Sequence, residues 1–567
     1  MGSCCETDRS SDLLAQETDS LLTQTQAPPS SSRPEPCTHH IRRGQSTTKP
    51  GQSKSPRKQF QRSSVGQKSI KTGHLHGREV AVSSPELILM KLQMPIKTLF
   101  ALNKELHRDL NATVYLAKHL QTGKERVVKQ VKKNKRANCT DANSEERLRG
   151  EVEMLSGLDH PNILKLYELY EDKLYFYLVS EALTGGYLMD YLTMGRNLSE
   201  PLAAKIIVQV MKALNYCHNR EVIHGNLRMD SLILQSTPTD DNVHVIVIGI
   251  GSAYIKSVTE KTKTTIGSSL YTAPETLQHA PNKKADVWSC GVILHMLLCG
   301  NPPFNGPTTD SILEQIASEP VTFPQELWEG VSSEAINLLR GMLNKDSATR
   351  ISFTESLNHP WLQANSKCTK SGPILQALRN LKIFKAKTSL KQTILAYIST
   401  HIDTNEEAKT LRDAFLSVDV NGDGLLSQEE LVTAYSKIMS RDEAVFVTEK
   451  VLKDVDFDHN GFVDYSEFML AAKNNKLLVT SQNLRTIFQL FDKDGSGKIA
   501  FSEFTETLKC HGLRSDDAMW AALMAEVNSD SDGELDFREF SRLLLAAVGM
   551  EETGKGGSIC GKSPQHL

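Results

Sequence analysis

Four twelve-residue segments in the last third of the chain repeat one arrangement of oxygen-bearing side chains. They begin at Asp419, Asp456, Asp492 and Asn528, so successive segments start 36 or 37 residues apart. Each segment has Gly at its sixth position, an aliphatic residue at its eighth and Glu at its twelfth, with Asp, Asn or Ser at its third and fifth. A repeat this regular predicts four structurally similar units in a row.

The spacing is that of the EF-hand calcium loop, in which side chains at positions 1, 3 and 5, the backbone carbonyl at 7 and a bidentate Glu at 12 bind the ion. Hard oxygen ligands in this number select Ca²⁺ over transition metals. A chance acidic repeat is the alternative, and four loops in register argue against it. The candidate ligands are Asp419, Asn421, Asp423, Leu425 and Glu430 in loop 1; Asp456, Asp458, Asn460, Phe462 and Glu467 in loop 2; Asp492, Asp494, Ser496, Lys498 and Glu503 in loop 3; and Asn528, Asp530, Asp532, Glu534 and Glu539 in loop 4. We expect weaker binding in loop 4, because the amide of Asn528 removes one negative charge.

The middle of the chain is predicted to form two lobes. Strand-like runs occupy residues 113–120, 125–131 and 174–181, and longer helical patterns follow at 201–219 and 284–300. A strand-rich lobe is therefore expected to precede a helix-rich lobe.

Motifs in the helix-rich part carry a family resemblance. The stretch "YTAPE" ends at Glu275, "DVWSCGVILHMLLCGNPPF" begins at Asp286, and "ATRIS" contains Arg350. On these motifs the region resembles a protein kinase, and residues Leu99 to Val548 together resemble the calcium-dependent protein kinases of plants and protists. The resemblance implies that Glu275 pairs with Arg350. It also implies that the basic, amphipathic segment from Pro373 to Ile402 is an autoinhibitory junction that calcium releases.

Several groups that phosphoryl transfer needs are replaced. Lys129 and Glu151 stand where the family has its strand Lys and helix Glu. The catalytic loop, however, reads "HGNLRMDS", with Asn226 in place of the Asp that orients the acceptor hydroxyl. The sequence also replaces both magnesium-binding groups and all three glycines of the phosphate loop. These substitutions are Ser231 for Asn, Val247 for Asp, and His107, Asp109 and Ala112 for Gly.

Losing one general acid or base typically costs 100- to 10,000-fold in rate, so these combined losses predict a pseudokinase. Its expected output is a calcium-gated binding event, as a scaffold or allosteric regulator that engages kinases or their substrates. The alternative is an atypical, catalytically active Ser/Thr kinase that transfers the γ-phosphate of ATP. A calcium buffer explains the loops but leaves the kinase-like region without a role. Calcium is the expected cofactor, Mg²⁺ and ATP are expected only for the active alternative, and no nucleic-acid partner is expected.

The N-terminal residues predict a membrane-attached tail. "MGSCCETD" offers Gly2 for myristoylation and Cys4 and Cys5 for palmitoylation, although Glu6 stands where the usual motif has Ser or Thr. Between Pro36 and Arg78 the chain is basic without any Asp or Glu. Two lipids, or one lipid with a polybasic segment, anchor a protein stably to an anionic membrane. We therefore expect a cytoplasmic protein attached to the cytosolic membrane face.

The predicted fold class is multidomain α+β, with a bilobal kinase-like domain followed by an all-α module of four EF-hands. At 567 residues the chain has room for several domains, and its cysteines lack the CxxC spacing of metal sites. The expected divisions are a disordered tail at 1–98, the kinase-like domain at 99–362, the junction at 363–402, the calmodulin-like module at 403–550 and a final tail at 551–567.

Overall fold

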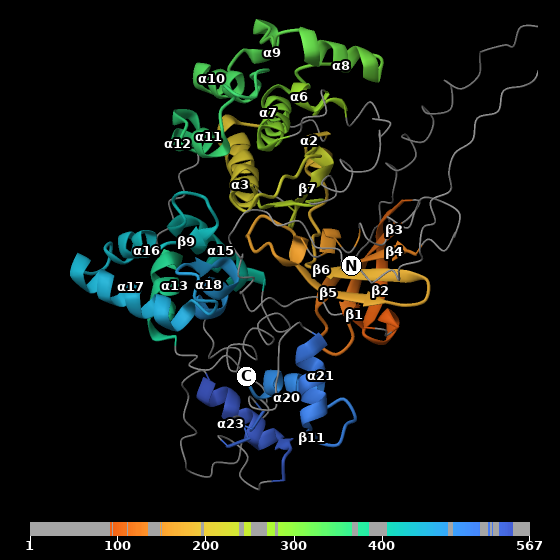
Figure 1. Ribbon diagram of the computed structural model, residues 1–567, viewed down its shortest axis with the longest axis vertical. Helices are drawn as coiled ribbons and strands as arrows, with labels where there is room; N and C mark the ends of the chain where they lie inside the picture. The colour runs from red at the N-terminus through yellow and green to blue at the C-terminus, as the bar shows by residue number, and fades with distance from the viewer. Residues whose placement is uncertain are drawn as a thin grey trace, which may run out of the picture. The chain divides into compact units, whose positions relative to one another are not determined.

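The computed structural model describes most of the residues in the regions expected to be folded (Figure 1). The described residues are 91–92, 95–109, 112–133, 148, 150–152, 154–193, 198–237, 243–250, 269–277, 282–365, 372–384, 405–473, 480–510, 520–521, 524–525 and 532–547. The predictions for Gly2, Cys4 and Cys5, for the basic tail, for the final tail and for residues 385–402 of the junction lie outside these ranges.

The strand-rich lobe is built on one six-stranded sheet with the order β1-β5-β6-β4-β3-β2. Strand β1 runs parallel to β5, and the other neighbours are antiparallel. The strands are β1 Lys91–Leu92, β2 Phe100–Arg108, β3 Ala112–His119, β4 Glu125–Lys132, β5 Leu166–Glu171 and β6 Tyr175–Ser180. The strands predicted at 113–120, 125–131 and 174–181 are confirmed as β3, β4 and β6.

The expectation of an irregular chain up to residue 98 is wrong for its last residues. Strand β1 adds to the edge of the sheet beside β5, and a short 3₁₀ helix follows at Ile96–Thr98. Ile96 and Phe100 are both buried in a small cluster with Val128 and Val179 of the sheet. The physical reason is that an edge strand offers unpaired backbone groups, and these recruit even a two-residue segment.

The helix-rich lobe is centred on two buried helices, α3 Glu200–Asn219 and α7 Lys283–Cys299, as predicted. Helix α7 begins where the Asn282 side chain accepts a hydrogen bond from the Lys284 amide, and it ends at Gly300 in the left-handed conformation. The surrounding elements are α2 Leu188–Thr193, η2 Met229–Ser231, β7 Leu232–Leu234, β8 Val245–Val247, α6 Pro274–Leu277, α8 Thr309–Ser318, α9 Gln325–Trp328, α10 Ser333–Met342, α11 Phe353–Leu357 and α12 Pro360–Asn365.

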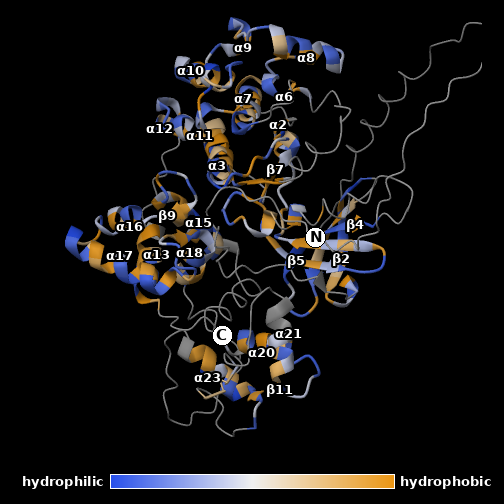
Figure 2. Cartoon of the chain, viewed as in Figure 1, coloured by the Kyte–Doolittle hydropathy of each residue, from blue (hydrophilic) through white to orange (hydrophobic). Residues whose placement is uncertain are grey.

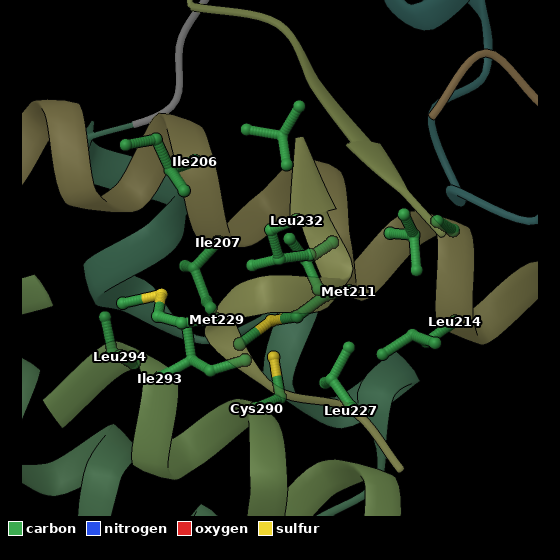
Figure 3. Packing of buried hydrophobic residues seen from close by; sticks show 14 of the residues in the cluster. Ile206, Ile207, Met211, Leu214, Leu227, Met229, Leu232, Cys290, Ile293 and Leu294 are labelled. Carbon is green, nitrogen blue, oxygen red and sulfur yellow. The ribbon is translucent and has the colours of Figure 1, made fainter. Parts of the chain in front are cut away.

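The core of this lobe fixes the loop between α3 and β7. Leu227 and Met229, which lie between the loop's polar residues, pack in the same cluster as Met211 of α3 and Ile293 of α7 (Figure 3). Helix α3 is coloured mostly hydrophobic in Figure 2, as expected for a helix covered by neighbours. The loop "HGNLRMDS" is therefore anchored by its apolar members, whatever its polar residues do.

The C-terminal module contains two lobes, each with its own core. The first has helices α15 Asn405–Val418, α16 Gln428–Tyr435, α17 Arg441–Val455 and α18 Tyr465–Ala472, with strands β9 Leu425–Leu426 and β10 Val463–Asp464. The second has α20 Ser481–Phe491, β11 Lys498–Ile499, α21 Phe501–Cys510, β12 Leu535–Asp536 and α23 Phe537–Ala547. The strands pair antiparallel, β9 with β10 and β11 with β12. The predicted fold class is confirmed.

None of the helices in the described part of the chain is long and apolar enough to cross a membrane. Cys217, Cys290 and Cys299, all in the helix-rich lobe, are free thiols, and the first two are buried.

Candidate functional site

The loop that carries Asn226 is held by one buried carboxylate. Asp286 of α7 accepts hydrogen bonds from the backbone amides of His224 at 2.9 Å and Gly225 at 2.8 Å, and its oxygen lies 2.8 Å from His218 Nε2. Burial opposes ionisation of Asp286, but these partners, with His218 foremost, hold its pKa below the usual value. The framework of a catalytic loop is therefore intact.

Three side chains on or beside that framework differ from those of the kinase motifs. Asn226 carries an amide, which takes up no proton from a hydroxyl near neutral pH. Ser231 is buried and donates its hydroxyl to the Asn226 carbonyl at 3.4 Å. Val247, at the end of β8, is 0% exposed and belongs to the apolar core. The position expected to face Mg²⁺ thus has no oxygen in its side chain.

The turn between β2 and β3 is closed by its own side chain. Asp109 Oδ1 accepts a hydrogen bond from the Ala112 amide at 2.6 Å, and the Asp109 amide donates to the Ala112 carbonyl at 2.9 Å. In a phosphate-binding loop, backbone amides must be free to approach the phosphate oxygens. Here a carboxylate already occupies the Ala112 amide and adds a negative charge, which disfavours an anionic ligand.

The predicted Lys129–Glu151 pair is present but loose. Lys129 Nζ lies 3.9 Å from Glu151 Oε1, and 42% of the Lys129 side chain is exposed. Such an exposed pair contributes little to stability. It leaves one element of an ATP-binding arrangement in place.

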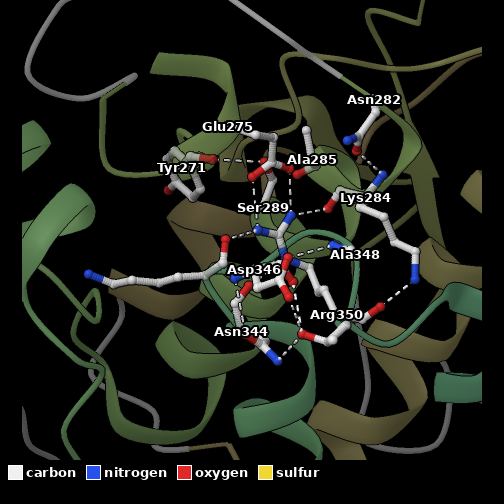
Figure 4. A network of polar contacts seen from close by, with 12 residues as sticks. Tyr271, Glu275, Asn282, Lys284, Ala285, Ser289, Asn344, Asp346, Ala348 and Arg350 are labelled. Carbon is white, nitrogen blue, oxygen red and sulfur yellow. Dashed lines mark hydrogen bonds and ion pairs between the residues drawn. The ribbon is translucent and has the colours of Figure 1, made fainter. Parts of the chain in front are cut away.

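The predicted Glu275–Arg350 pair is confirmed as a buried, two-pronged contact (Figure 4). Arg350 Nη1 and Nη2 donate to the two carboxylate oxygens of Glu275 at 2.6 and 2.9 Å. The same guanidinium also donates to the carbonyls of Lys284 and Asn344. This network ties α6, α7 and the segment before α11 together, so its role is to hold the lobe.

The predicted calcium ligands converge in loops 2 and 3. Carboxylate oxygens of Asp456, Asp458 and Glu467 lie within 4.8 Å of one another, as do those of Asp492, Asp494 and Glu503. The carboxylates of loop 1, although described, form no group of this kind. Asn528 and Asp530 of loop 4 lie outside the described residues, while Asp532, Glu534 and Glu539 lie within them.

The loops fit a cation by their unpaired oxygens. Asp419 Oδ2, Asp464 Oδ1 and Asp492 Oδ1 are buried and receive no hydrogen bond from the described residues. Buried carboxylate oxygens without donors are costly, and a bound cation removes that cost. Asp419 and Asp492 hold position 1 of their loops, and Asp464 holds position 9 of loop 2. The donor set therefore fits Ca²⁺, with these oxygens as ligands.

Burial in loop 2 makes calcium binding sensitive to pH. Burial, followed by the nearby charges of Asp159 and Asp458, raises the pKa of Asp464 to about 7. Burial, with the neighbouring Asp464, raises the pKa of Glu467 to about 9. Calcium binds the ionised carboxylates, so it has to displace protons from both groups. Acidification is therefore expected to weaken loop 2.

Helix α13 Gly372–Ile383, within the predicted junction, packs into the first lobe of the C-terminal module. Ala377, Leu378 and Leu381 are buried there against α15, α17 and α18. The Tyr435 hydroxyl donates to the Leu378 carbonyl at 2.8 Å, and Asn380 donates to the Ala472 carbonyl. The apolar face predicted for this helix is thus covered by the first EF-hand pair.

Sequence reasoning missed contacts between the calcium loops and the kinase domain. Ser466, in loop 2, donates its amide and hydroxyl to Asp159 at 2.6 and 2.8 Å. In loop 1, Lys212 of α3 donates to the Asp419 carbonyl at 2.9 Å. Hydrophobic periodicity indicates the buried face of α3. It does not indicate which distant segment of the chain forms a hydrogen bond with a polar residue beside that face, such as Lys212.

Comparisons with known proteins agree with this architecture. The protein kinase domain family matches residues 102–362, and the EF-hand domain pair family matches residues 408–473 and 481–545. Calcium-dependent protein kinase 4 of Plasmodium berghei (strain Anka) is 36% identical over 429 residues, which cover 73% of this chain and 80% of that protein. The chain belongs to the calcium-dependent protein kinase family.

Other members of this family show similar agreement. Calcium-dependent protein kinase 4 of Plasmodium falciparum (isolate 3D7) is 34% identical over 73% of this chain and 80% of its own length. Calcium-dependent protein kinase 33 of Arabidopsis thaliana is 33% identical over 79% of this chain and 84% of its own length. The likeness therefore extends across both the kinase domain and the EF-hand module.

Proposed function

We propose that this member of the calcium-dependent protein kinase family does not transfer phosphate and acts through calcium-dependent binding. Its kinase domain then serves as a scaffold or allosteric regulator, and its EF-hands decide when a protein partner is engaged. The expected partners are active kinases or their substrates. Calcium is the cofactor of this function, and ATP with Mg²⁺ is not required.

The observation that carries the proposal is the apolar burial of Val247. Mg²⁺ neutralises the charge that develops on the transferred phosphoryl group, so phosphoryl transfer depends on holding the metal. Val247 offers no ligand, and its surroundings are the packed core beside Leu232 and Ile163. The Asp109 carboxylate at the Ala112 amide and the amide of Asn226 act in the same direction. Several separate elements of the reaction are thus missing together.

The test is incorporation of labelled phosphate from ATP by the purified full-length protein. We expect none above a Lys129→Ala control, with Mg²⁺ or Mn²⁺ and with or without calcium, while the same preparation binds calcium. Incorporation that requires both calcium and Lys129 would overturn the proposal.

A second candidate, an atypical active kinase, is favoured by two observations. The Lys129–Glu151 pair and the loop framework around Asp286 are both retained. In this case another acid would replace Asn226, and Asp230 is the nearest carboxylate along the chain. Asp230, however, forms an ion pair with Arg228 on the loop itself. Phosphate incorporation that Asp230→Asn abolishes would identify this alternative.

The calcium-dependent partner is the positive part of the proposal. Immobilised full-length protein should retain an active relative or its substrates from an extract with calcium and release them with a chelator. The matched control carries Glu430→Gln, Glu467→Gln, Glu503→Gln and Glu539→Gln, which remove the position-12 ligand from every loop. Retention of the same proteins by this control would exclude calcium gating.

The proposal places the protein at the cytosolic face of a membrane. Its support is the sequence alone, through Gly2, Cys4, Cys5 and the basic segment that follows. We expect the protein to sediment with membranes and Gly2→Ala to become soluble. If the Gly2→Ala variant and the Cys4→Ser, Cys5→Ser double variant both still sediment with membranes, lipid anchoring is contradicted.

A further inference from the structure

Loop 1 rests on a small surface of the kinase domain formed by His160, Lys212, Asn215 and Tyr216. Lys212 Nζ donates to the Asp419 carbonyl at 2.9 Å, and Asn215 Nδ2 donates to the Gly422 carbonyl at 3.4 Å. A Cβ atom added at Gly424 would lie 2.5 Å from Tyr216 Cδ2 and 2.8 Å from His160 Cδ2. We call these four residues the docking surface. The contact is too close for any residue except Gly at position 6 of the loop.

The docking surface brings a positive charge to the first calcium ligand. Lys212 Nζ lies 3.8 Å from Asp419 Oδ2, and the two side chains are 15% and 0% exposed. This is the Asp419 oxygen that receives no hydrogen bond from the described residues. The Lys212 ammonium therefore faces the oxygen that calcium would take as a ligand.

Two cations then compete for one carboxylate. Water screens the repulsion between them poorly, because both side chains are largely buried. Loops 2 and 3 gather their carboxylates within 4.8 Å, whereas loop 1 does not. Loop 1 is thus both less convergent and closer to a fixed positive charge than loops 2 and 3.

We infer that Lys212 lowers the calcium affinity of loop 1 while that loop lies on the docking surface. Because the coupling between two binding events is reciprocal, calcium in loop 1 weakens docking by the same factor. Lys212 is then a residue of the kinase domain that sets the calcium threshold of the first EF-hand pair. The inference rests on the calcium-regulated part of the proposed function and is independent of whether phosphate is transferred.

The experiment is a calorimetric calcium titration of the full-length protein. Glu503→Gln and Glu539→Gln silence loops 3 and 4, so that the first pair is observed alone. In this background we compare Lys212→Met with Lys205→Met, which removes an exposed lysine from the same helix. We expect Lys212→Met to tighten binding about fivefold or more. Lys205→Met should leave the affinity unchanged.

Two further variants separate charge from packing. Lys212→Arg keeps the positive charge and should leave calcium affinity unchanged, while Lys212→Gln removes the charge with a polar side chain and should tighten binding as Lys212→Met does. Equal affinities for the parent, Lys212→Met and Lys212→Gln would overturn the inference, as would a gain for Lys212→Arg. The result does not depend on nucleotide, so a positive phosphate assay would refute the proposed pseudokinase function and leave this inference standing.

Discussion

At the scale of single residues, the kinase domain keeps the side chains that hold its loops in place but has different side chains at the catalytic and metal-binding positions. Asp286 holds the amides of His224 and Gly225, and Arg350 holds Glu275, as a functional kinase would require. Asn226, Val247 and Asp109 occupy positions where charge and metal are handled. The hydrogen bonds of the framework are therefore present around three side chains that differ from the kinase motifs, which is the basis of the proposed loss of phosphoryl transfer.

Restoring one residue should not restore transfer. We expect Asn226→Asp to leave phosphate incorporation undetectable, because Mg²⁺ still lacks the ligand at Val247 and the Ala112 amide remains bound to Asp109. Labelled-phosphate assays with calcium and Mg²⁺ measure this directly. The control is the double variant that carries both Asn226→Asp and Lys129→Ala. A gain of about 100-fold or more, the usual contribution of a general base, would show that the remaining site is competent.

At the scale of secondary structure elements, helix α13 is buried on one face by the helices of the first EF-hand pair. Its apolar side chains lie in the core of the first EF-hand pair, while Ile383 at its end is 67% exposed. The junction and the first pair therefore form one folding unit in this arrangement. A substitution in either part is expected to change the stability of both.

Truncating the buried face of α13 should destabilise that unit. We expect Leu378→Ala to lower the free energy of unfolding by about 2–5 kcal/mol, because it removes a fully buried side chain and leaves a cavity. The matched control, Ile383→Ala on the same helix, should change it by less than about 0.5 kcal/mol. Urea unfolding of the calcium-free protein measures both, and equal losses would show that α13 is not packed as described.

The pH dependence of the helix-rich lobe is set partly by His295 of α7. Burial lowers the pKa of His295 to about 4, although its hydrogen bond to the Asn301 carbonyl opposes this. The folded state therefore binds this proton less readily than the unfolded state. The corresponding stability is complete above pH 6.5 and is lost as the pH falls toward 4.

Replacing His295 tests that assignment. The Gln side chain of His295→Gln is not protonated in this pH range and still offers a donor to the Asn301 carbonyl. Between pH 7 and pH 4 we therefore expect the variant to lose roughly 3 kcal/mol less of its free energy of unfolding than the parent protein loses. Thermal unfolding at a series of pH values is the measurement. Parallel curves for the two proteins would place the pH dependence elsewhere.

At the scale of the whole molecule, calcium should change the stability of the EF-hand module selectively. When free calcium is at 100 times the dissociation constant of a site, its binding stabilises the folded state by about 2.7 kcal/mol, and a chelator removes this stabilisation. We expect a chelator to lower the unfolding temperature of the EF-hand module and to leave that of the kinase domain nearly unchanged. Scanning calorimetry with and without chelator resolves the two, and Glu503→Gln, which removes a loop 3 ligand, should reduce the shift.

Much of this architecture could be predicted from the sequence, since loop spacing and helical periodicity are local signals. The strands β3, β4 and β6, the helices α3 and α7 and the convergence of loops 2 and 3 all follow from them. The contacts of Lys212 and Ser466 could not be predicted, because they join segments hundreds of residues apart through single polar groups. Strand β1 was missed because two residues carry no periodicity, and their structure comes from the sheet edge they join.

The burial of Val247 also determines what a metal ligand at this position would cost in stability. An Asp at this position would enter a packed apolar core, where an unpaired carboxylate is costly and a raised pKa would leave it neutral. A single Val247→Asp substitution is therefore expected to lower the stability of the kinase domain before its carboxylate could hold a metal ion. Building a magnesium ligand at this position would require a second substitution nearby that pairs with the new carboxylate or opens the core to water.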